Sequence, residues 1–486
     1  MQWGRVKANL DPTPTSLFTQ ILPPCGSTNF RHRVSLSPAP STFLAVRPHL
    51  AELLEDLPRI LGGNADPVSL TGEKGAVERG GDTAHAVDII GWSFRRDSQP
   101  NRTSRQSPAA PNAAQFPNRA GGESIMTSTF DEALERLRGT GSEVAGGVAP
   151  NHGPMAAEAL VALGCDDIVV AWADRYRRQL GAMSPPSSPV TAGGWAQALG
   201  AIDRFADWVA FFRAQLAEAP WRVVFREWIG RLLPATPSAG AHGLIRTAHA
   251  LRALADTETA LRVEELGVAL AYWAAYYRKL PGIPRLAGAL DLGEALRRIP
   301  LFLSGQARPG MPREVYLRVM QSHGGEFSEA VDGAAEPESV EDALSLLTEA
   351  GASLYLTNAS RQPLVLLHTV TAPAALRLLL PHLPAALHKT ALAYVWQNVA
   401  ATVAAYGDDG PSERDNWPPQ EQSVIIERSI ATDDPHALKF AEACIREHRL
   451  SPQPVYLAAA ADWASRLHRA RHWSRAERDA AGLEFR

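Results

Sequence analysis

Apolar residues recur at helical spacing through almost the whole chain after Met126. The spacing i, i+3, i+4, i+7, i+11 of a buried helix face is followed by Phe205, Trp208, Val209, Phe212 and Leu216. Similar patterns occur at Val223–Leu233, Ala260–Leu280, Leu387–Tyr406, His436–His448 and Val455–Leu467. Short strand-like runs occur around Ser353–Leu356 and Leu364–Leu367, and Pro373 is placed as at a helix start. The sequence therefore predicts a mainly α fold with a single large helical domain.

The first 125 residues have a different character. Ser93–Gly121 is polar and rich in Pro, Asn, Ser and Arg, so it cannot bury enough apolar surface to offset its ordering entropy. One short amphipathic helix is expected at Pro48–Leu61. After Met126, Thr129 and Glu132 have the spacing of a capping box. We expect residues 1–125 to be a disordered or poorly structured low-complexity extension and residues 126–486 to be the helical domain. The extension is either a real part of the protein or a segment upstream of a natural start at Met126.

Composition excludes several classes of protein. The chain has 486 residues, a net charge of -4 and a pI of about 6.4, which argues against a general nucleic-acid binder. No continuous apolar run reaches the ~18 residues of a membrane span, and the N-terminus lacks an apolar secretory segment. Cys25, Cys165 and Cys444 are too far apart for a cysteine zinc site or a disulfide framework. We expect a cytoplasmic protein without a membrane or nucleic-acid partner.

The glycine fingerprints of nucleotide-binding folds are missing. Gly139 and Gly141 form a partial G-x-G, but Val144 stands where the third glycine should be, and the segment follows a helix. The chain also lacks the G-x-x-x-x-G-K-[ST], G-x-S-x-G and H-E-x-x-H motifs. Simple dinucleotide-binding, P-loop, α/β-hydrolase and zincin interpretations are therefore excluded.

Histidines occupy marked positions in the predicted helices. His152 lies directly before a helix start, and His368 ends an apolar run. His242 and His249 are seven residues apart, so both rings point to one side of a helix, about 10.5 Å apart along its axis. His436 follows Asp433-Asp434-Pro435. Each could instead be a buried histidine with a satisfied hydrogen bond. Neutral imidazoles with oxygen donors suit iron or zinc, and the spacing does not choose the metal.

Five ordered blocks of sequence carry a family resemblance. They are NHGPMAAEALVALG (151–164), AHGLIRTAHALRALA (241–255), LAYWAAYYRKLPG (270–282), HTVTAPAALRLLLPHLP (368–384) and DDPHALKFAEACI (433–445). On these blocks the chain after Met126 resembles the questin oxidase-like family. The resemblance implies an oxygenase acting on anthraquinones and related aromatic polyketides, with a Baeyer–Villiger-like, ring-opening and NADPH-linked outcome.

The resemblance also implies a metal site. A ring-cleaving member of the family uses non-haem iron held by four histidines and a carboxylated lysine. The matching histidines in this sequence are His152, His242, His249 and His368, with His436 competing with His368 for the fourth place. Lys439, one turn after His436, matches the lysine. A lysine ammonium cannot bind a metal, but its product with CO₂ is an anionic oxygen donor.

Ring cleavage by O₂ needs a source of electrons. The missing dinucleotide fingerprint argues against bound flavin, whereas iron with open coordination positions and an electron-rich hydroquinone substrate would suffice. NADPH could then serve a separate reductase. Arg246 could pair with a substrate phenolate or carboxylate, or form a structural ion pair. Two roles, stacking on a planar substrate or packing in the core, are possible for the aromatic residues Tyr272, Trp273, Tyr276 and Tyr277.

Other functions compete with the iron oxygenase. One is a metal-free, NADPH-dependent Baeyer–Villiger-type oxidase. Another is a non-catalytic helical scaffold that binds a partner or an aromatic metabolite, and a third is a zinc hydrolase with a carbamylated lysine. Elemental analysis of the purified protein discriminates among them.

Overall fold

The computed structural model describes residues 71–75, 89–93, 128–144, 147, 149–308, 312–358, 362–408, 417–473, 477–478 and 481–483. The chain divides into two units, Met1–Ala120 and Gly121–Arg486. In the first unit, β1 (Thr71–Gly75) pairs antiparallel with β2 (Ile89–Ser93). The helix expected at Pro48–Leu61 and the polar segment after Ser93 lie outside the described residues.

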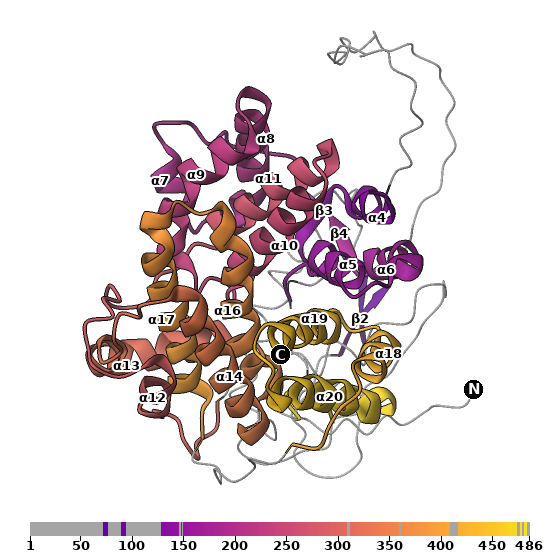
Figure 1. The fold of residues 1–486 in the computed structure, drawn as a ribbon. Helices are drawn as coiled ribbons and strands as arrows, with labels where there is room; N and C mark the ends of the chain where they lie inside the picture. The colour runs from indigo at the N-terminus through magenta and orange to yellow at the C-terminus, as the bar shows by residue number, and fades with distance from the viewer. Residues whose placement is uncertain are drawn as a thin grey trace, which may run out of the picture. The chain divides into compact units, whose positions relative to one another are not determined.

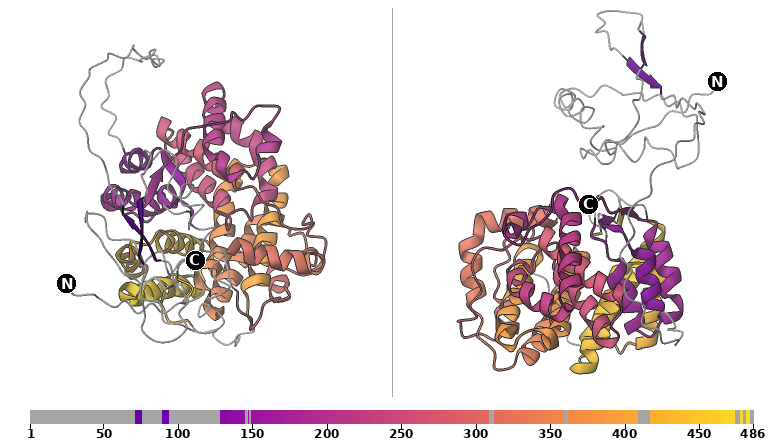
Figure 2. Two further views of the ribbon diagram at one scale, coloured as in Figure 1. Left: turned by 180° about the vertical axis from the view of Figure 1, so that it is seen from behind. Right: turned by 90° about the horizontal axis from the view of Figure 1, so that it is seen from above.

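The second unit is built almost entirely of helices, which confirms the mainly α prediction (Figures 1 and 2). They are α4 (Thr129–Leu137), α5 (Gly153–Ala162), α6 (Asp166–Arg177), α7 (Trp195–Ala198), α8 (Phe205–Glu218), α9 (Trp221–Leu232), α10 (His242–Asp256), α11 (Ala260–Ala275), α12 (Leu292–Arg297), α13 (Pro312–Asp332), α14 (Val340–Asn358), α15 (Pro363–Leu366), α16 (His368–Leu379), α17 (His388–Tyr406), α18 (Gln422–Thr432), α19 (Pro435–Leu450) and α20 (Pro454–Arg469). Two short strands, β3 (Thr140–Val144) and β4 (Leu180–Ala182), pair antiparallel beside α4.

Helices α5, α10, α16 and α19 form the centre of this unit. Helix α10 packs against α5, α11 and α16, and α19 packs against α5, α16 and α20 (Figure 1). Tryptophans are prominent among the largest fully buried side chains, where they serve as core packing. They include Trp172, Trp208, Trp228, Trp273, Trp396 and Trp463. The four central helices can therefore present residues from distant parts of the chain to one buried point.

Both strand-like runs are helical, so that part of the sequence prediction is wrong. Ser353–Leu356 lies within α14, and Leu364–Leu367 covers α15 and the following residue. A short apolar run fits a buried helix as well as a strand, and here the length of the surrounding helix decides. Pro373 also lies inside α16 rather than at its start. Because proline has no N–H, the carbonyl of Thr369 lacks the usual hydrogen bond within the helix. Gly351 of α14 approaches this carbonyl closely.

Helix α4 starts one residue before the position that the capping pattern indicated. Ser128 is the N-cap, and its hydroxyl accepts a hydrogen bond from the Asp131 backbone N–H at 3.1 Å. Thr129 is the first helical residue, and its hydroxyl points to Asp166 instead. The amphipathic helix itself was predicted correctly, with Phe130 and Leu134 buried.

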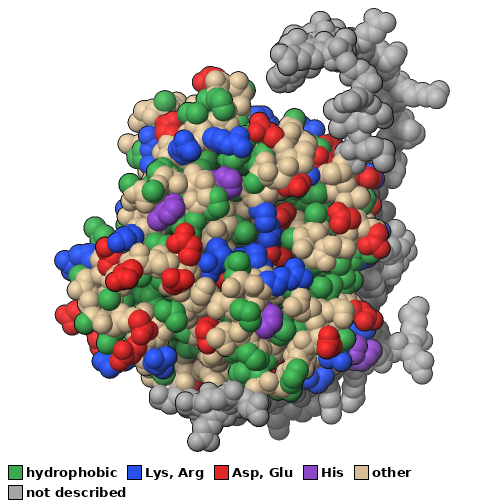
Figure 3. All heavy atoms as spheres, in the orientation of Figure 1, with side chains coloured by type: hydrophobic (Ala, Val, Ile, Leu, Met, Phe, Trp, Pro, Cys, Tyr) green, Lys and Arg blue, Asp and Glu red, His purple; other side chains and the backbone are tan. Residues whose placement is uncertain are grey.

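One segment, Pro363–His382, is long and apolar enough to cross a membrane, but 89% of its most apolar stretch is buried inside the fold. This is how a core helix of a folded protein behaves. On the face drawn in Figure 3, acidic and basic side chains are interspersed rather than gathered into a large area of one sign.

Candidate metal centre

Four predicted site histidines lie at the N-terminal ends of the four central helices. His152 precedes α5, His242 and His368 are the first residues of α10 and α16, and His436 is the second residue of α19. A helix N-terminus carries a partial positive charge, so it disfavours an imidazolium and favours a nearby anion. Because the four helices meet, their sequence positions translate into one buried group of imidazoles.

The rings of these histidines are in contact. The Nε2 atoms of His152 and His242 lie 2.8 Å apart. One ligand atom from each of His152, His242 and His436 falls within 4.8 Å of the others. The ring centroids of His242 and His368 are 5.0 Å apart. We call His152, His242, His368 and His436 the histidine cluster; all four are buried.

Unusual backbone geometry holds His242 in place. Ala239, Gly240 and Ala241 have φ angles of 48°, 66° and 66°, and the left-handed region is unfavourable for the two alanines. This turn directs the carbonyl oxygen of Ala239 to Nδ1 of His242, which donates a hydrogen bond to it. Nε2 of His242 therefore keeps its lone pair and accepts from Nε2–H of His152.

His368 and His436 are held in the same manner, with Nδ1 turned toward an oxygen. Nδ1 of His368 donates to the carbonyls of Leu364 and Val365 at 3.1 and 3.2 Å. Nδ1 of His436 lies 3.6 Å from Oδ1 of Asp434. Nε2 of His368 is buried and has no hydrogen-bond partner among the described residues. An Nδ1 fixed by oxygen and an open Nε2 are typical of histidines that bind a metal.

Burial keeps the cluster uncharged. It lowers the pKa of every histidine in the cluster, and that of His368 falls to about 3. The positive charge of Lys439, three residues after His436 on α19, lowers each of these pKa values further. Lys439 is 4% exposed, and burial lowers its own pKa to about 7 against the opposing effect of Asp434.

The cluster fits a transition-metal ion. Two nitrogens that each lie about 2.1 Å from one ion, at a right angle, are about 3 Å apart. The 2.8 Å between Nε2 of His152 and Nε2 of His242 is close to that separation. Neutral imidazoles are the form that binds a metal, and the orphaned Nε2 of His368 supplies a further donor. Such a donor set suits iron or zinc.

His249 lies apart from the cluster, contrary to the expectation that it meets His152 and His242. Two turns along α10 place it at the level of Glu158, whose Oε2 lies 2.6 Å from Nδ1 of His249. Its ring makes no ring contact with the cluster among the described residues. His436 takes the neighbouring position that we expected for His249.

Arg252 ties this second level of α10 to α5 and α19. Its guanidinium binds Glu158 at 2.6 and 2.5 Å and also binds Glu442, one turn after Lys439. Burial raises the pKa of Glu442, but Arg446 and Arg252 outweigh it and hold that pKa below its usual range. Sequence reasoning missed these carboxylates. Their signal is a lone glutamate inside an apolar helix, where an unpaired charge is strongly disfavoured.

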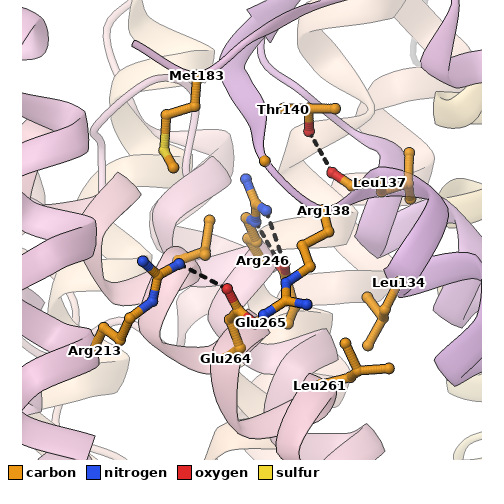
Figure 4. A pocket seen from close by; sticks show the side chains of 12 residues that line it. Leu134, Leu137, Arg138, Thr140, Met183, Arg213, Arg246, Leu261, Glu264 and Glu265 are labelled. Atoms are coloured by element: carbon orange, nitrogen blue, oxygen red, sulfur yellow. Dashed lines mark hydrogen bonds and ion pairs between the residues drawn. The ribbon is translucent and has the colours of Figure 1, made fainter. Parts of the chain in front are cut away.

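Arg246, one turn after His242, forms a buried ion pair. Its Nε and Nη2 donate to the two carboxylate oxygens of Glu265 at 2.6 and 2.9 Å (Figure 4). A pocket of about 40 Å³ reaches this pair from outside. Arg213 lines the pocket and binds Glu264 at 2.7 Å. Two of the three guanidinium nitrogens of Arg246 therefore serve a structural ion pair, which was one of the two roles expected for this residue.

The predicted aromatic lining divides into different roles. Trp273 donates its indole N–H to the Ala235 carbonyl at 3.1 Å and packs on Gly243, so the structure gives it a core role instead of a pocket role. Tyr272 stacks on Tyr276 with ring centroids 4.3 Å apart. Tyr277 is only partly buried and lies below the ammonium of Lys279.

Comparison with known proteins identifies the family. The questin oxidase-like family model matches residues 149–444, more than half of the chain, and this range includes the histidine cluster and Lys439. A search of curated proteins gives no match. The chain therefore belongs to the questin oxidase-like family, whose name indicates an oxidase or oxygenase.

Proposed function

We propose that the chain is an oxygenase that holds a non-haem iron ion in the histidine cluster and oxidises or ring-cleaves an anthraquinone-like aromatic compound. The observation that carries the proposal is the convergence of four buried, neutral imidazoles, three of which have an Nδ1 atom turned toward an oxygen. Iron bound there would supply the chemistry with O₂. The chain's own residues bury the rings, keep them neutral and turn Nδ1 of His242, His368 and His436 toward oxygen, which leaves the lone pair of each of these three rings on Nε2.

Lys439 supports this proposal as a further ligand. It lies buried beside the cluster, on the helix that carries His436. Its amine can add CO₂, forming an N–C bond and releasing a proton, and the resulting carbamate bears an anionic pair of oxygens. The positive ends of the surrounding helices favour such an anion. His249 stays a candidate ligand from the family resemblance, because Glu158 holds its Nδ1 in the same way.

The source of reducing power is a second part of the proposal. The described residues contain two sheets of two strands each, which is not the parallel sheet of a dinucleotide-binding fold. We therefore assign any use of NADPH to a separate reductase that converts the quinone to its hydroquinone. The hydroquinone then brings the electrons to the site.

Elemental analysis and oxygen uptake test the function together. Protein from iron-supplemented cells should contain about one iron per chain and should consume O₂ with a chemically reduced hydroxyanthraquinone. Removal of iron by a chelator should abolish the uptake, and added Fe²⁺ should restore it. Metal-free protein that turns over with NADPH would favour the metal-free oxidase. Zinc at two positions would favour a hydrolase, and neither metal nor turnover would favour a binding scaffold.

A further inference from the structure

Arg246 lies between the histidine cluster and the outer pocket. On α10 it follows His242 by four residues, so both side chains share one helix face. It is 4% exposed, and its two hydrogen bonds to Glu265 fix the plane of the guanidinium. Such rigidity is what a binding site needs from an anchor, because little further order is lost when a ligand arrives.

The third nitrogen of this guanidinium is unused. Nη1 of Arg246 is buried and has no hydrogen-bond partner among the described residues. In Figure 4 one terminal nitrogen of Arg246 carries no dashed line and points away from Glu265. Leaving a buried donor unpaired costs about 1–3 kcal/mol, and more for a charged group. Arg262 provides the contrast: all its nitrogens have partners, among them Asp131 and Ser128.

A second unused donor lies on the facing helix. Tyr272 is buried on α11, two turns after Glu265, and its hydroxyl has no partner in the described part of the chain. Its neighbour Trp273 touches Gly243, which places Tyr272 at the level of the first turn of α10. Burial raises the pKa of Tyr272, and the charge of Arg246 acts in the opposite direction, so the two groups lie within electrostatic reach.

We propose that Arg246 and Tyr272 form a subsite that binds an ionised aromatic hydroxyl group of the substrate. The guanidinium can only donate and the tyrosine hydroxyl can donate as well, so one acceptor would satisfy both groups, and an anionic oxygen is the strongest acceptor for a guanidinium. The ring of Tyr272 stacks on that of Tyr276, so the hydroxyl of Tyr272 is held in an aromatic environment. Glu265 is the positioning residue that aims the guanidinium. This inference rests on the proposed function for its aromatic substrate.

A matched pair of probes tests the subsite by binding alone. We would titrate 2-hydroxyanthraquinone and 2-methoxyanthraquinone into chelator-treated protein and follow tryptophan fluorescence and the visible absorption of the ligand. One charge-assisted hydrogen bond predicts a preference of at least about ten-fold for the hydroxy compound. The bound hydroxy compound should show the long-wavelength absorption of its phenolate at a pH where the free compound is neutral. Chelated protein removes the metal as an alternative phenolate ligand.

Conservative variants separate an anchor from a structural role. Tyr272→Phe should keep or raise the melting temperature, since it deletes an unpaired hydroxyl, while it reduces the preference several-fold. Arg246→Gln combined with Glu265→Gln avoids an unpaired buried carboxylate and should abolish both the preference and the phenolate spectrum. The control, Arg262→Gln with Asp131→Asn, changes a fully partnered pair of similar burial and should leave both unchanged.

Each other outcome overturns a definite part of the argument. Equal affinity for both probes, binding of neither, or a phenolate spectrum that appears only with iron would overturn the subsite. A preference that survives the double change at Arg246 and Glu265 would do the same. These results leave the proposed function standing if the protein still holds iron and consumes O₂. If the wild-type protein holds no iron and consumes no O₂ but still prefers the hydroxy compound, the proposed oxygenase function is wrong and the subsite stands.

Discussion

The Nε2 atoms of His152 and His242 lie 2.8 Å apart, although 90 residues separate the two histidines in the chain. Two contacts outside the ring pair produce this approach. The Tyr176 hydroxyl accepts a hydrogen bond from the backbone N–H of His152 at 2.9 Å, and the Ala239 carbonyl holds Nδ1 of His242. Because burial keeps both rings neutral, they approach each other without the repulsion of two like charges.

His436 should matter more for metal binding than His249. In the structure His436 stands with the cluster, whereas His249 is bound to Glu158. We expect His436→Ala to lose most of its iron and His249→Ala to retain clearly more. Inductively coupled plasma mass spectrometry gives the metal content, and circular dichroism checks that both variants remain helical.

His448→Ala is the control for this comparison. His448 lies on the same helix as His436, but its Nδ1 contacts the Gln453 carbonyl near the end of α19. Its loss should leave the iron content unchanged. Full iron in His436→Ala, or greater loss in His249→Ala, would contradict the arrangement proposed for the cluster.

Lys439 should be replaceable by an added carboxylate. Lys439→Ala removes the proposed oxygen donor and leaves a buried space beside the cluster. We expect most of the iron to be lost and part of it to return in acetate, but not in chloride at the same ionic strength. Wild-type protein equilibrated with ¹³C-bicarbonate should show a carbamate carbon by NMR. Undiminished iron in Lys439→Ala, or a wild type without the carbamate signal, would rule out this ligand.

Three of the four helix starts of the site could be predicted from the sequence, because they are marked locally, whereas the start of α16 at His368 was missed. His152 precedes a Gly-Pro pair, and His436 follows Asp434 and Pro435, which are typical cap and first-turn residues. His242 follows a glycine-containing turn that breaks the preceding helical region. Once a histidine is known to start a helix, only the meeting of the helices remains to be found, and the family resemblance supplied that step.

The pairing partners could not be predicted, because they depend on contacts between distant segments. Glu158 and Glu442 meet at Arg252 only after α5, α10 and α19 have packed, and no local pattern encodes that register. The exchange of His249 for His436 has the same origin. Helical spacing placed His242 and His249 on one face, but the neighbouring helices decide which point of that face is the site.

Gly243 should be intolerant of a side chain. A Cβ atom there would lie 2.5 Å from Cγ of Trp273, which is too close for any contact. We expect Gly243→Ala to lower the free energy of unfolding by about 1–3 kcal/mol and to reduce bound iron, because it displaces the first turn of α10. Urea denaturation and metal analysis provide the two readouts.

Gly230→Ala is the matched change. Gly230 lies in the exposed part of α9, where the nearest atom to an added Cβ is 3.8 Å away. Alanine should stabilise that helix by up to about 1 kcal/mol through its higher helix propensity, without any effect on iron. Equal stability of the two variants would contradict the close packing of α10 on α11, and full iron in Gly243→Ala would show that the first turn of α10 can move without consequence for the site.

Arg252 should be the most costly of these residues to remove. Arg252→Met leaves the carboxylates of Glu158 and Glu442 buried without their shared partner, which we expect to lower the free energy of unfolding at pH 7 by about 3 kcal/mol or more. Combining it with Glu158→Gln and Glu442→Gln should recover much of that loss.

The pH dependence of unfolding checks the electrostatic cause. In the wild type the pKa of both carboxyl groups is lowered on folding, so their contribution to stability is present above an unfolded pKa of about 4.3 and is lost as the pH falls through the lowered values. The triple variant lacks these groups, so its stability should fall less between pH 7 and pH 3 in urea denaturation. A wild type and triple variant with the same acid dependence, or Arg252→Met as stable as the wild type, would show that the network does not hold α5, α10 and α19 together.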